Sequence, residues 1–499
     1  MISDRSAKLL LKSCSSSAVA VAVTATNTNS TTKYAGVTSL WIRPRSRKIC
    51  ATMNPWPWLV LVVAIVLSVL QTSRSDGGAH TQTVTSRKGK DFENGVGGDG
   101  PPSARAGHGM DAWDMYVGEV YLFGGCVNMS NNYTSSFGSL ALWHGCTGFS
   151  NEVWKMYWDE HSGQISWWRL WSQPNTTRDS YMHRDPFNGE SAAYASARAG
   201  CSVIGFDSPD SAATTLFVFG GVGLQDGPTT ADTWLFDTAQ GAWTAVNVST
   251  PPPPRAYHST VHWKDLMIIF GGLQVTFDVH HYTMYTFAGD VAVFNTTSRR
   301  WYTFDDANPS PQWNQEGIMV GHPQALHQSN DAPVPRAYHA ASLHSSFANT
   351  MFVYGGAAGT GHYYQDWFFD DLWTLEWDSA EALLSGKMTW TRLTPSSETV
   401  RPPPLFGQTL MWCNGSELAM MWGMMPNKSA PANATATQTL WRINLNTMTW
   451  RKPTGLYQKA RAFFATVSVG CGGWLSAGLA GFGGQSELLS DFSEAGALP

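Results

Sequence analysis

The sequence predicts an all-β protein made from a repeated unit of four short strands. In residues 253–301 a Pro-Arg-Ala-Tyr-His head containing Arg255 precedes an apolar run, 266–270, that ends at a pair of glycines. A loop, a second run at 290–295 and a lone Trp301 complete the unit. Short apolar runs between turn residues are typical of strands. The same order of features recurs along the chain, which indicates structural repeats.

Six heads can be recognised. They begin at Arg105, Arg198, Arg255, Arg336, a weakened Leu405 and Arg461. Each is followed by an aromatic residue with one or two glycines, and then by a short strand that starts with Asp or Asn and contains an aromatic residue. The closing residues are Trp167 or Trp168, Trp243, Trp301, Trp390 and Trp450. In this order the features resemble the kelch repeat, and the resemblance covers nearly everything from about residue 101 onward.

The resemblance implies a kelch-type β-propeller with six recognisable four-stranded repeats, the last of them incomplete. Four strands per unit of roughly 40 to 50 residues suit one propeller blade, and radial repetition leaves only short, protected sheet edges. We therefore expect the Arg, His and Trp residues of the heads to be structural. No closing Trp follows Asp491 and Phe492. Either residues 81–86 add a strand that closes the ring, or the chain is part of a longer protein.

Composition narrows the functional classes. Only 14% of the residues are charged and 13% are aromatic, against about 25% charged in an average soluble protein. The net charge is −5, with no basic block in the repeats. A nucleic acid is therefore excluded as a partner.

The N-terminal part is expected to direct the repeats across a membrane. Residues 1–52 are basic and Ser/Thr-rich and are predicted to be disordered, 53–75 to be a signal peptide or signal anchor, 76–100 to be a flexible linker and 101–499 to be the propeller. The apolar core at 59–70 is shorter than the ~20 residues of a spanning helix and suits a signal peptide. Two alternatives stay open: cleavage, with Met53 as the true start, or an anchor with the repeats outside.

Sequons favour the same placement, in the secretory pathway or outside the cell. They lie at Asn128, Asn132, Asn175, Asn247, Asn295, Asn414, Asn427 and Asn433.

Five of the seven cysteines fall in the repeats. Cys126 and Cys146 share one loop, the arrangement expected of a local disulfide. For Cys201, Cys413 and Cys471, buried free thiols are at least as reasonable as pairing.

Loop lengths indicate a binding face. The second-to-third loops and the links between repeats, which lie on one face of a propeller, are extended at 126–150, 172–196, 273–289, 302–335 and 357–370. Insertions concentrated on one face usually mark the binding face of a repeat protein. The candidate binding residues are His280, His281, Tyr282, Tyr285, His362, Tyr363, Tyr364 and Trp367. Aromatic and His side chains suit a protein or glycan ligand, although they can also fold back and pack.

An enzyme is the alternative function. Kelch-type propellers also form the body of galactose-oxidase-like copper enzymes and of some sugar isomerases, and His280, His281, His362, Tyr282 and Tyr363 have the residue types of a copper site. None of the five cysteines lies in these loops, and no Gly-rich phosphate loop is present. We therefore favour a binding module with no catalytic residue, metal or cofactor.

Overall fold

The computed structural model contains two compact units, Met1–Thr83 and Val84–Pro499. In the first it describes the backbone of three strands, and in the second it describes residues 99–495 with gaps. The gaps are 115–118, 130–144, 160–163, 173–193, 208–212, 224–226, 249, 278–282, 305–311, 314–318, 321–331, 344–348, 359–366, 397–399, 414–415, 427–433, 454–459, 470–471, 476–478, 481–486 and 489–492.

The first unit contains an antiparallel sheet of β1 (Ala7–Leu11), β2 (Val19–Ala25) and β3 (Val37–Ile42). It lies within residues 1–52, for which the sequence predicts disorder. The predicted signal or anchor at 53–75 and the linker up to residue 98 are outside the described residues. Among the described residues, no helix is long and apolar enough to cross a membrane.

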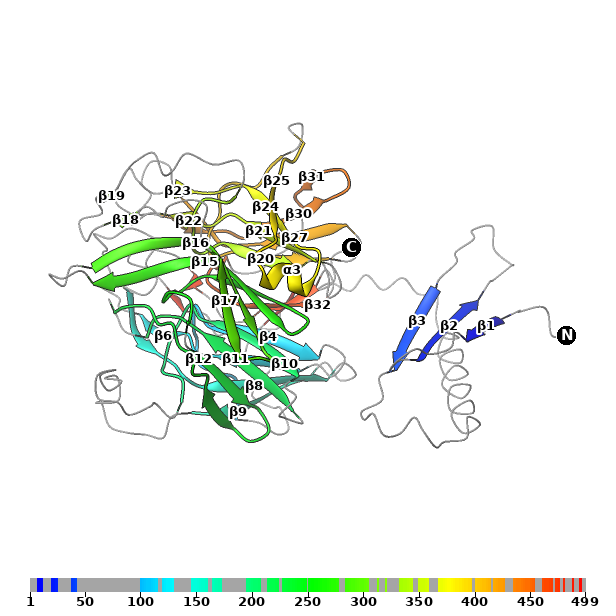
Figure 1. Ribbon diagram of the computed structural model, residues 1–499, viewed down its shortest axis with the longest axis horizontal. Coiled ribbons are helices and arrows are strands. Elements are labelled where there is room, and N and C mark those ends of the chain that lie inside the picture. The colour runs from blue at the N-terminus through cyan, green and yellow to red at the C-terminus, as the bar shows by residue number, and fades with distance from the viewer. Residues whose placement is uncertain are drawn as a thin grey trace. The chain divides into compact units, whose positions relative to one another are not determined.

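The second unit is a propeller with five four-stranded antiparallel blades (Figure 1). The first blade is β4 (Gly109–Asp114), β5 (Glu119–Phe123), β8 (Val153–Asp159) and β9 (Gln164–Trp171). The second is β10 (Ser202–Asp207), β11 (Thr214–Phe219), β12 (Thr233–Asp237) and β13 (Ala242–Ala245). The third is β14 (Ser259–Trp263), β15 (Leu266–Phe277), β16 (Thr283–Asn295) and β17 (Arg300–Phe304).

The fourth and fifth blades repeat this order. They are β20 (Ala340–Leu343), β21 (Thr350–Tyr354), β24 (Leu372–Glu376) and β25 (Thr389–Leu393), then β26 (Thr409–Trp412), β27 (Glu417–Met421), β30 (Leu440–Asn444) and β31 (Thr449–Arg451). The sixth repeat forms a three-stranded sheet of β32 (Thr466–Val469), β33 (Gly472–Leu475) and β36 (Ser493–Ala495). The predicted kelch-type propeller with an incomplete last unit is thus confirmed.

A continuous ring of backbone hydrogen bonds closes the propeller at its axis. Six N–H groups, one per repeat, each donate to the carbonyl of the repeat before it. The donor and acceptor pairs are Gly107 to Phe463, Gly200 to Gly107, Tyr257 to Gly200, Tyr338 to Tyr257, Gly407 to Tyr338 and Phe463 to Gly407, at 2.7 to 3.0 Å. The sixth repeat therefore completes the inner ring; residues 81–86, the alternative closing segment, lie outside the description.

Every residue of this ring has a positive φ, between 53° and 68°. Glycine adopts that conformation freely, whereas other residues pay about 1–2 kcal/mol. Tyr257, Tyr338 and Phe463 adopt it because their rings pack together at the axis, with the Tyr257 and Tyr338 centroids 4.7 Å apart. A Cβ at Gly200 would lie 2.9 Å from the Tyr257 ring, so glycine leaves room for its aromatic neighbour.

A second tier of short hairpins extends beyond the glycine pairs. It consists of β6–β7 (Cys126–Met129, Cys146–Phe149), β22–β23 (Ala357–Ala358, Trp367–Phe368), β28–β29 (Met424–Met425, Thr435–Ala436), β34–β35 (Leu479–Ala480, Glu487–Leu488) and the far halves of β15 and β16. Two further strands, β18 (Gln312–Trp313) and β19 (Met319–Val320), continue the sheet of the third blade. The apolar core of the tier includes Phe149, Val275, Phe287 and Phe369 and is continuous with the aromatic residues of the axis.

Candidate functional site

In the first four repeats the arginine of the head is buried and joins three parts of its blade. Its guanidinium donates to the carbonyl of the first glycine of the pair and to a carboxylate, which lies just before the third strand in three blades and within β16 in the third blade. The ion pairs are Arg105–Glu152, Arg198–Asp232, Arg255–Asp290 and Arg336–Asp371. The glycine acceptors are Gly124, Gly220, Gly271 and Gly355, at 2.9 to 3.1 Å. These arginines therefore have a structural role, as the sequence predicts.

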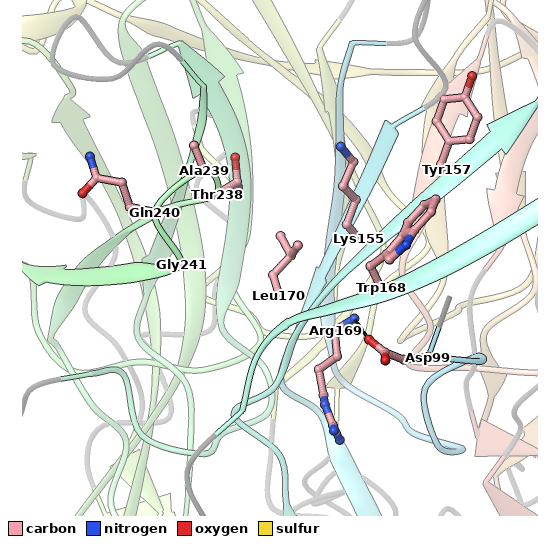
Figure 2. Close-up of a pocket in the computed structure, with 10 residues that line it drawn as sticks. All are labelled: Asp99, Lys155, Tyr157, Trp168, Arg169, Leu170, Thr238, Ala239, Gln240 and Gly241. Carbon is pink, nitrogen blue, oxygen red and sulfur yellow. Dashed lines mark hydrogen bonds between the residues drawn. The ribbon is translucent and has the colours of Figure 1, made fainter. Parts of the chain in front are cut away.

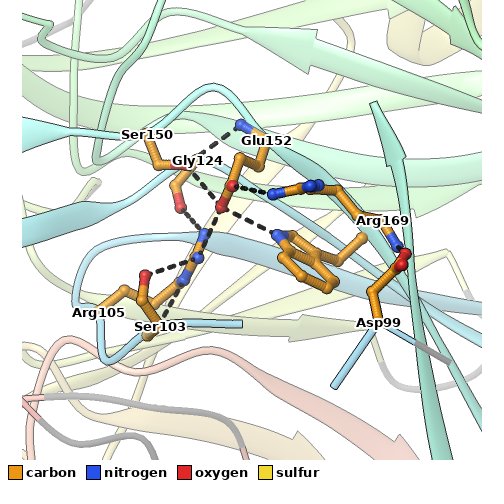
Figure 3. Close-up of polar contacts among 8 residues, drawn as sticks. Asp99, Ser103, Arg105, Gly124, Ser150, Glu152 and Arg169 are labelled. Atoms are coloured by element: carbon orange, nitrogen blue, oxygen red, sulfur yellow. Dashed lines mark hydrogen bonds and ion pairs between the residues drawn. The ribbon is translucent and has the colours of Figure 1, made fainter. Parts of the chain in front are cut away.

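In the first blade this network reaches the protein surface (Figure 3). Glu152 Oε2 accepts from Arg105 Nη2 at 3.1 Å and from Trp154 Nε1 at 3.0 Å. Glu152 Oε1 accepts from Arg169 at 3.4 Å, and the Arg169 backbone N–H donates to Asp99 Oδ2 at 2.9 Å. Burial acts to raise the pKa of Glu152, but the hydrogen bonds from Trp154 and Arg105 and the two cationic charges hold that pKa below its usual value. Glu152 therefore stays ionised and links the head to the rim.

The head histidines connect neighbouring blades. His258 Nε2 lies 2.5 Å from Ser202 Oγ, and His339 Nε2 lies 2.8 Å from Ser259 Oγ. Burial, followed by the charge of Arg336, lowers the pKa of His339 to about 3. The same Ser–His contact occurs between two successive pairs of blades, and its imidazole is buried. We therefore interpret these pairs as packing contacts between blades rather than as catalytic dyads.

A cavity of about 160 Å³ lies at the axis. It is lined by the ring residues and by the residue after each, including Cys201 and Gln408. Cys201 is a free thiol whose pKa is raised to about 12 by burial. A thiol that stays protonated is a poor nucleophile, so the cavity has no activated group of this kind.

Most of the candidate binding residues fall outside the described part of the chain. These are His280, His281, Tyr282, His362, Tyr363 and Tyr364. Trp367 begins β23 and so belongs to the second tier. Tyr285 is only 6% exposed and packs in the core of that tier, because it faces inward where β16 continues past the propeller. The packing alternative therefore applies to Tyr285, which is corrected from a binding residue to a core residue.

Cys126 and Cys146, for which the sequence predicts a disulfide, are joined in the β6–β7 hairpin. Cys413 is also disulfide-bonded. Of the asparagines in sequons, Asn128 and Asn247 are exposed and Asn295 is half-buried in the β16–β17 turn. Asn132, Asn175, Asn414, Asn427 and Asn433 lie outside the described residues.

A groove at the outer rim was not predicted from the sequence (Figure 2). It has a volume of about 600 Å³ and lies between β8–β9 of the first blade and the β12–β13 turn of the second. Tyr157 and Trp168 line it with 36% and 37% of their surface exposed. The tandem Trp167-Trp168 is the signal that could have revealed it: Trp167 is buried as the closing residue, which leaves Trp168 on the other face of the strand.

The described residues offer no group of three or more His, Cys, Asp or Glu side chains with the geometry to hold a metal ion. The copper-type residues considered above lie in the loops at 280–282 and 362–363, outside that description.

Comparisons with known proteins agree with the fold. Residues 194–324 match the family model described as the KLHDC2/KLHL20/DRC7 Kelch-repeats domain. The chain is 26% identical over 238 residues to the leucine-zipper-like transcriptional regulator 1 homolog of Drosophila melanogaster, covering 48% of this chain and 19% of that protein. It is 24% identical over 269 residues to Host cell factor of Drosophila melanogaster, covering 51% of this chain and 15% of that protein.

An F-box/kelch-repeat protein of Arabidopsis thaliana is 24% identical over 229 residues, covering 44% of this chain and 42% of that protein. The match thus spans less than half the length of each of these relatives. Together the blades, the heads and the family match define a kelch-type β-propeller, a class suited to binding proteins.

Proposed function

We propose that this propeller is a protein-binding module that receives its ligand on the face carrying the second tier. The observation that carries the proposal is the tier itself. Hairpins extend from the blades of the first, third, fourth and fifth repeats, and they share one apolar core. A rigid platform that presents long loops is the usual way in which a repeat protein builds a recognition surface.

The proposed contacts are aromatic and His side chains at the tips of this tier. The chain carries His280, His281 and Tyr282 between β15 and β16, and His362, Tyr363 and Tyr364 between β22 and β23. Such side chains combine apolar area with polar groups and are enriched among residues that dominate binding energies. We propose a protein as the ligand. A glycan is the alternative ligand, and it would contact the same side chains.

The test is a triple variant, Tyr363→Ala, Tyr364→Ala and Trp367→Ala, in the full chain produced by a secreting eukaryotic host. Proteins cross-linked to the wild-type chain are identified, and each is titrated against the triple variant and against Thr244→Ala, which changes an exposed position of β13. At least a tenfold weaker Kd for the triple variant alone supports the proposal. Unchanged affinity refutes it, and a glycan array bound by the wild type but not by the triple variant identifies a sugar ligand instead.

We propose further that the propeller resides outside the cell or in the secretory lumen. Disulfides form and persist mainly in oxidising compartments, and the chain has one at Cys126–Cys146 and a second involving Cys413. The exposed sequon asparagines Asn128 and Asn247 are consistent with glycosylation there.

Glycosidase treatment of the full chain made in eukaryotic cells tests this placement. Supporting results are a drop in mass on glycan removal and its partial loss in Asn128→Gln and Asn247→Gln. Whether 53–75 is cleaved or remains as a membrane anchor follows from the N-terminal sequence of the same sample. A chain without glycans, with reduced cysteines, in the cytosolic fraction would contradict the proposal.

A further inference from the structure

The disulfide at Cys413 has its partner outside the described part of the chain. Cys413 follows β26 directly, is fully buried and is disulfide-bonded. Cys126 and Cys146 are bonded to each other, and Cys201 is free. The cysteines that remain as partners within the chain are Cys14, Cys50 and Cys471.

The side chain of Cys413 faces the sixth repeat. Successive side chains of a strand point to opposite faces of its sheet, and those of β26 belong to two different apolar clusters. Leu410 packs in a cluster with Tyr354 of the fourth blade, whereas Cys413 belongs to a cluster that contains Phe464 of the sixth repeat. Cys413 therefore lies in the contact between the fifth and sixth repeats. In the sequence, Cys471 is the one cysteine of the sixth repeat.

Cys471 occupies the matching connection of that repeat. β26 and β32 each start just after a residue of the axial ring, Gly407 and Phe463, so the two strands run in the same direction. They also lie side by side. Cys413 starts the connection from β26 to β27, and Cys471 ends the two-residue connection from β32 to β33. The chain thus brings both cysteines to the same end of two neighbouring strands.

Apart from the ring, apolar packing holds the sixth repeat to the fifth. At the position where His258 and His339 contact a serine of the preceding blade, the sixth repeat has Phe464. Its ring packs on Trp422 with the centroids 5.3 Å apart. The described sheet of the sixth repeat has three strands, whereas the sheet of each blade has at least four. A covalent bond at the far end of β26 would therefore hold the repeat that has the fewest strands.

We propose that Cys413 and Cys471 form a disulfide that cross-links the fifth blade to the incomplete sixth repeat. The two thiols together pass two electrons and two protons to a disulfide oxidant such as glutathione disulfide, which is reduced to two thiols. This bond spans a longer stretch of chain than the Cys126–Cys146 bond, and it therefore restricts the unfolded chain more. It rests on the oxidising compartment proposed above only for its oxidant, and it does not depend on the ligand of the second tier.

The bond is mapped in the full chain purified from a secreting eukaryotic host. Free thiols are blocked with N-ethylmaleimide in denaturant, glycans are removed, and tryptic peptides are compared by mass spectrometry before and after reduction. We expect one pair of peptides linked through Cys413 and Cys471, and a blocked Cys201. A sample in which Cys413 is linked to any other cysteine, or is blocked while Cys126 is bonded, overturns the proposal.

A sample in which every cysteine is blocked would contradict the placement outside the cytosol instead. The same protein is then oxidised with glutathione disulfide under native conditions and mapped again. A link between Cys413 and Cys471 in that sample supports the pairing, and its absence overturns it.

Substitutions test whether the bond holds the sixth repeat. Cys413→Ser and Cys471→Ser should each lower Tm by at least about 5 °C. The double variant should lower Tm no further, because either substitution removes the same bond. Cys201→Ser, which replaces a free thiol, is the matched control and should leave Tm nearly unchanged. Additive losses from the two single variants would show that the two residues are not bonded, and the mapping of the wild type decides the pairing if a variant is not secreted.

Discussion

Arg336 and Asp371 are held together by two parallel hydrogen bonds, Nη1 to Oδ1 at 2.6 Å and Nη2 to Oδ2 at 3.0 Å. The two side chains are 0% and 4% exposed. Such a pair need not stabilise the fold more than apolar residues would, but removing one partner leaves a buried charge uncompensated.

We therefore expect Asp371→Ala to lower the free energy of unfolding by about 3–5 kcal/mol. Arg169→Ala is the control, because that arginine is 46% exposed in its ion pair with Glu152, and exposed pairs contribute about 0–1 kcal/mol. Urea unfolding of the two variants measures both values. Equal losses would show that burial does not distinguish the two ion pairs.

The fifth blade lacks this pair, and both members are replaced together. Leu405 stands where the other heads have arginine. Thr439 stands where they have the carboxylate, since its carbonyl accepts from the Trp422 N–H as that of Asp371 accepts from the Gly355 N–H. Trp441 Nε1, which would donate to that carboxylate, has no hydrogen-bond partner among the described residues.

Leu405→Arg alone should thus destabilise the protein by about 3 kcal/mol or more, because it buries an unpaired cation. Adding Thr439→Asp should recover at least about 2 kcal/mol by pairing it. A double-mutant cycle by thermal denaturation measures the coupling. Additive effects would mean that the fifth blade cannot hold the pair.

Gly220→Ala and Gly241→Ala separate crowding from backbone strain. Their φ angles are +66° and +62°, but a Cβ at Gly220 would lie 2.5 Å from the Arg255 carbonyl oxygen, whereas the nearest atom at Gly241 is 3.6 Å away. Gly241→Ala should cost about 1–2 kcal/mol for the left-handed conformation, and Gly220→Ala should cost more or prevent folding. Comparable Tm values for the two would contradict the close approach of the blades.

Stability should fall as the pH drops below about 6.5, the pKa of an unfolded histidine. Burial, then the charge of Arg105, lowers the pKa of His108 to about 3, and burial and Arg336 do the same for His339. Between these pH values the unfolded state binds more protons, so each histidine reduces the free energy of unfolding by up to about 1.4 kcal/mol per pH unit. Asp111, whose pKa burial raises to about 7, opposes the loss.

The fifth repeat provides the control for this pH dependence. Gln408 takes the place of the histidine and donates to the Tyr354 carbonyl at 2.9 Å. His339→Gln should keep a similar contact without titrating, and so should flatten the decline between pH 6.5 and 3 that urea unfolding measures in the wild type. A profile that does not change on this substitution would assign the acid sensitivity to other groups.

The Cys126–Cys146 disulfide closes a loop with a sequence separation of 20 residues. Replacing both cysteines with Ser should lower the free energy of unfolding by about 3 kcal/mol through the added freedom of the unfolded chain. Thermal unfolding of the wild type with and without reductant gives an independent measure. No difference in either comparison would mean that the bond is not formed in the protein.

The order of the repeated motifs was sufficient to predict the architecture. The head, the glycines and the closing Trp each have a fixed structural role, and six copies of this order predict the blades of a propeller. The sequence predicted Tyr285 to be a binding residue because the same sequence pattern fits a side chain that points to solvent and one that points inward. The second tier, whose core buries it, forms only when hairpins from separate repeats meet.

The sequence by itself determined the class of fold, the six repeats, the structural role of the head arginines and the Cys126–Cys146 pair. These depend on features that recur or lie close together in the chain. The tertiary structure alone decided how the ring closes, through the hydrogen bonds from Gly107 to Phe463 and onward. It alone also showed that α3 (Ala380–Leu384) fills one space between blades while Trp168 is left exposed in another. The closure of the ring and the filling of the spaces between blades depend on the distance between neighbouring blades and on the connection that lies between them. A local sequence pattern contains neither.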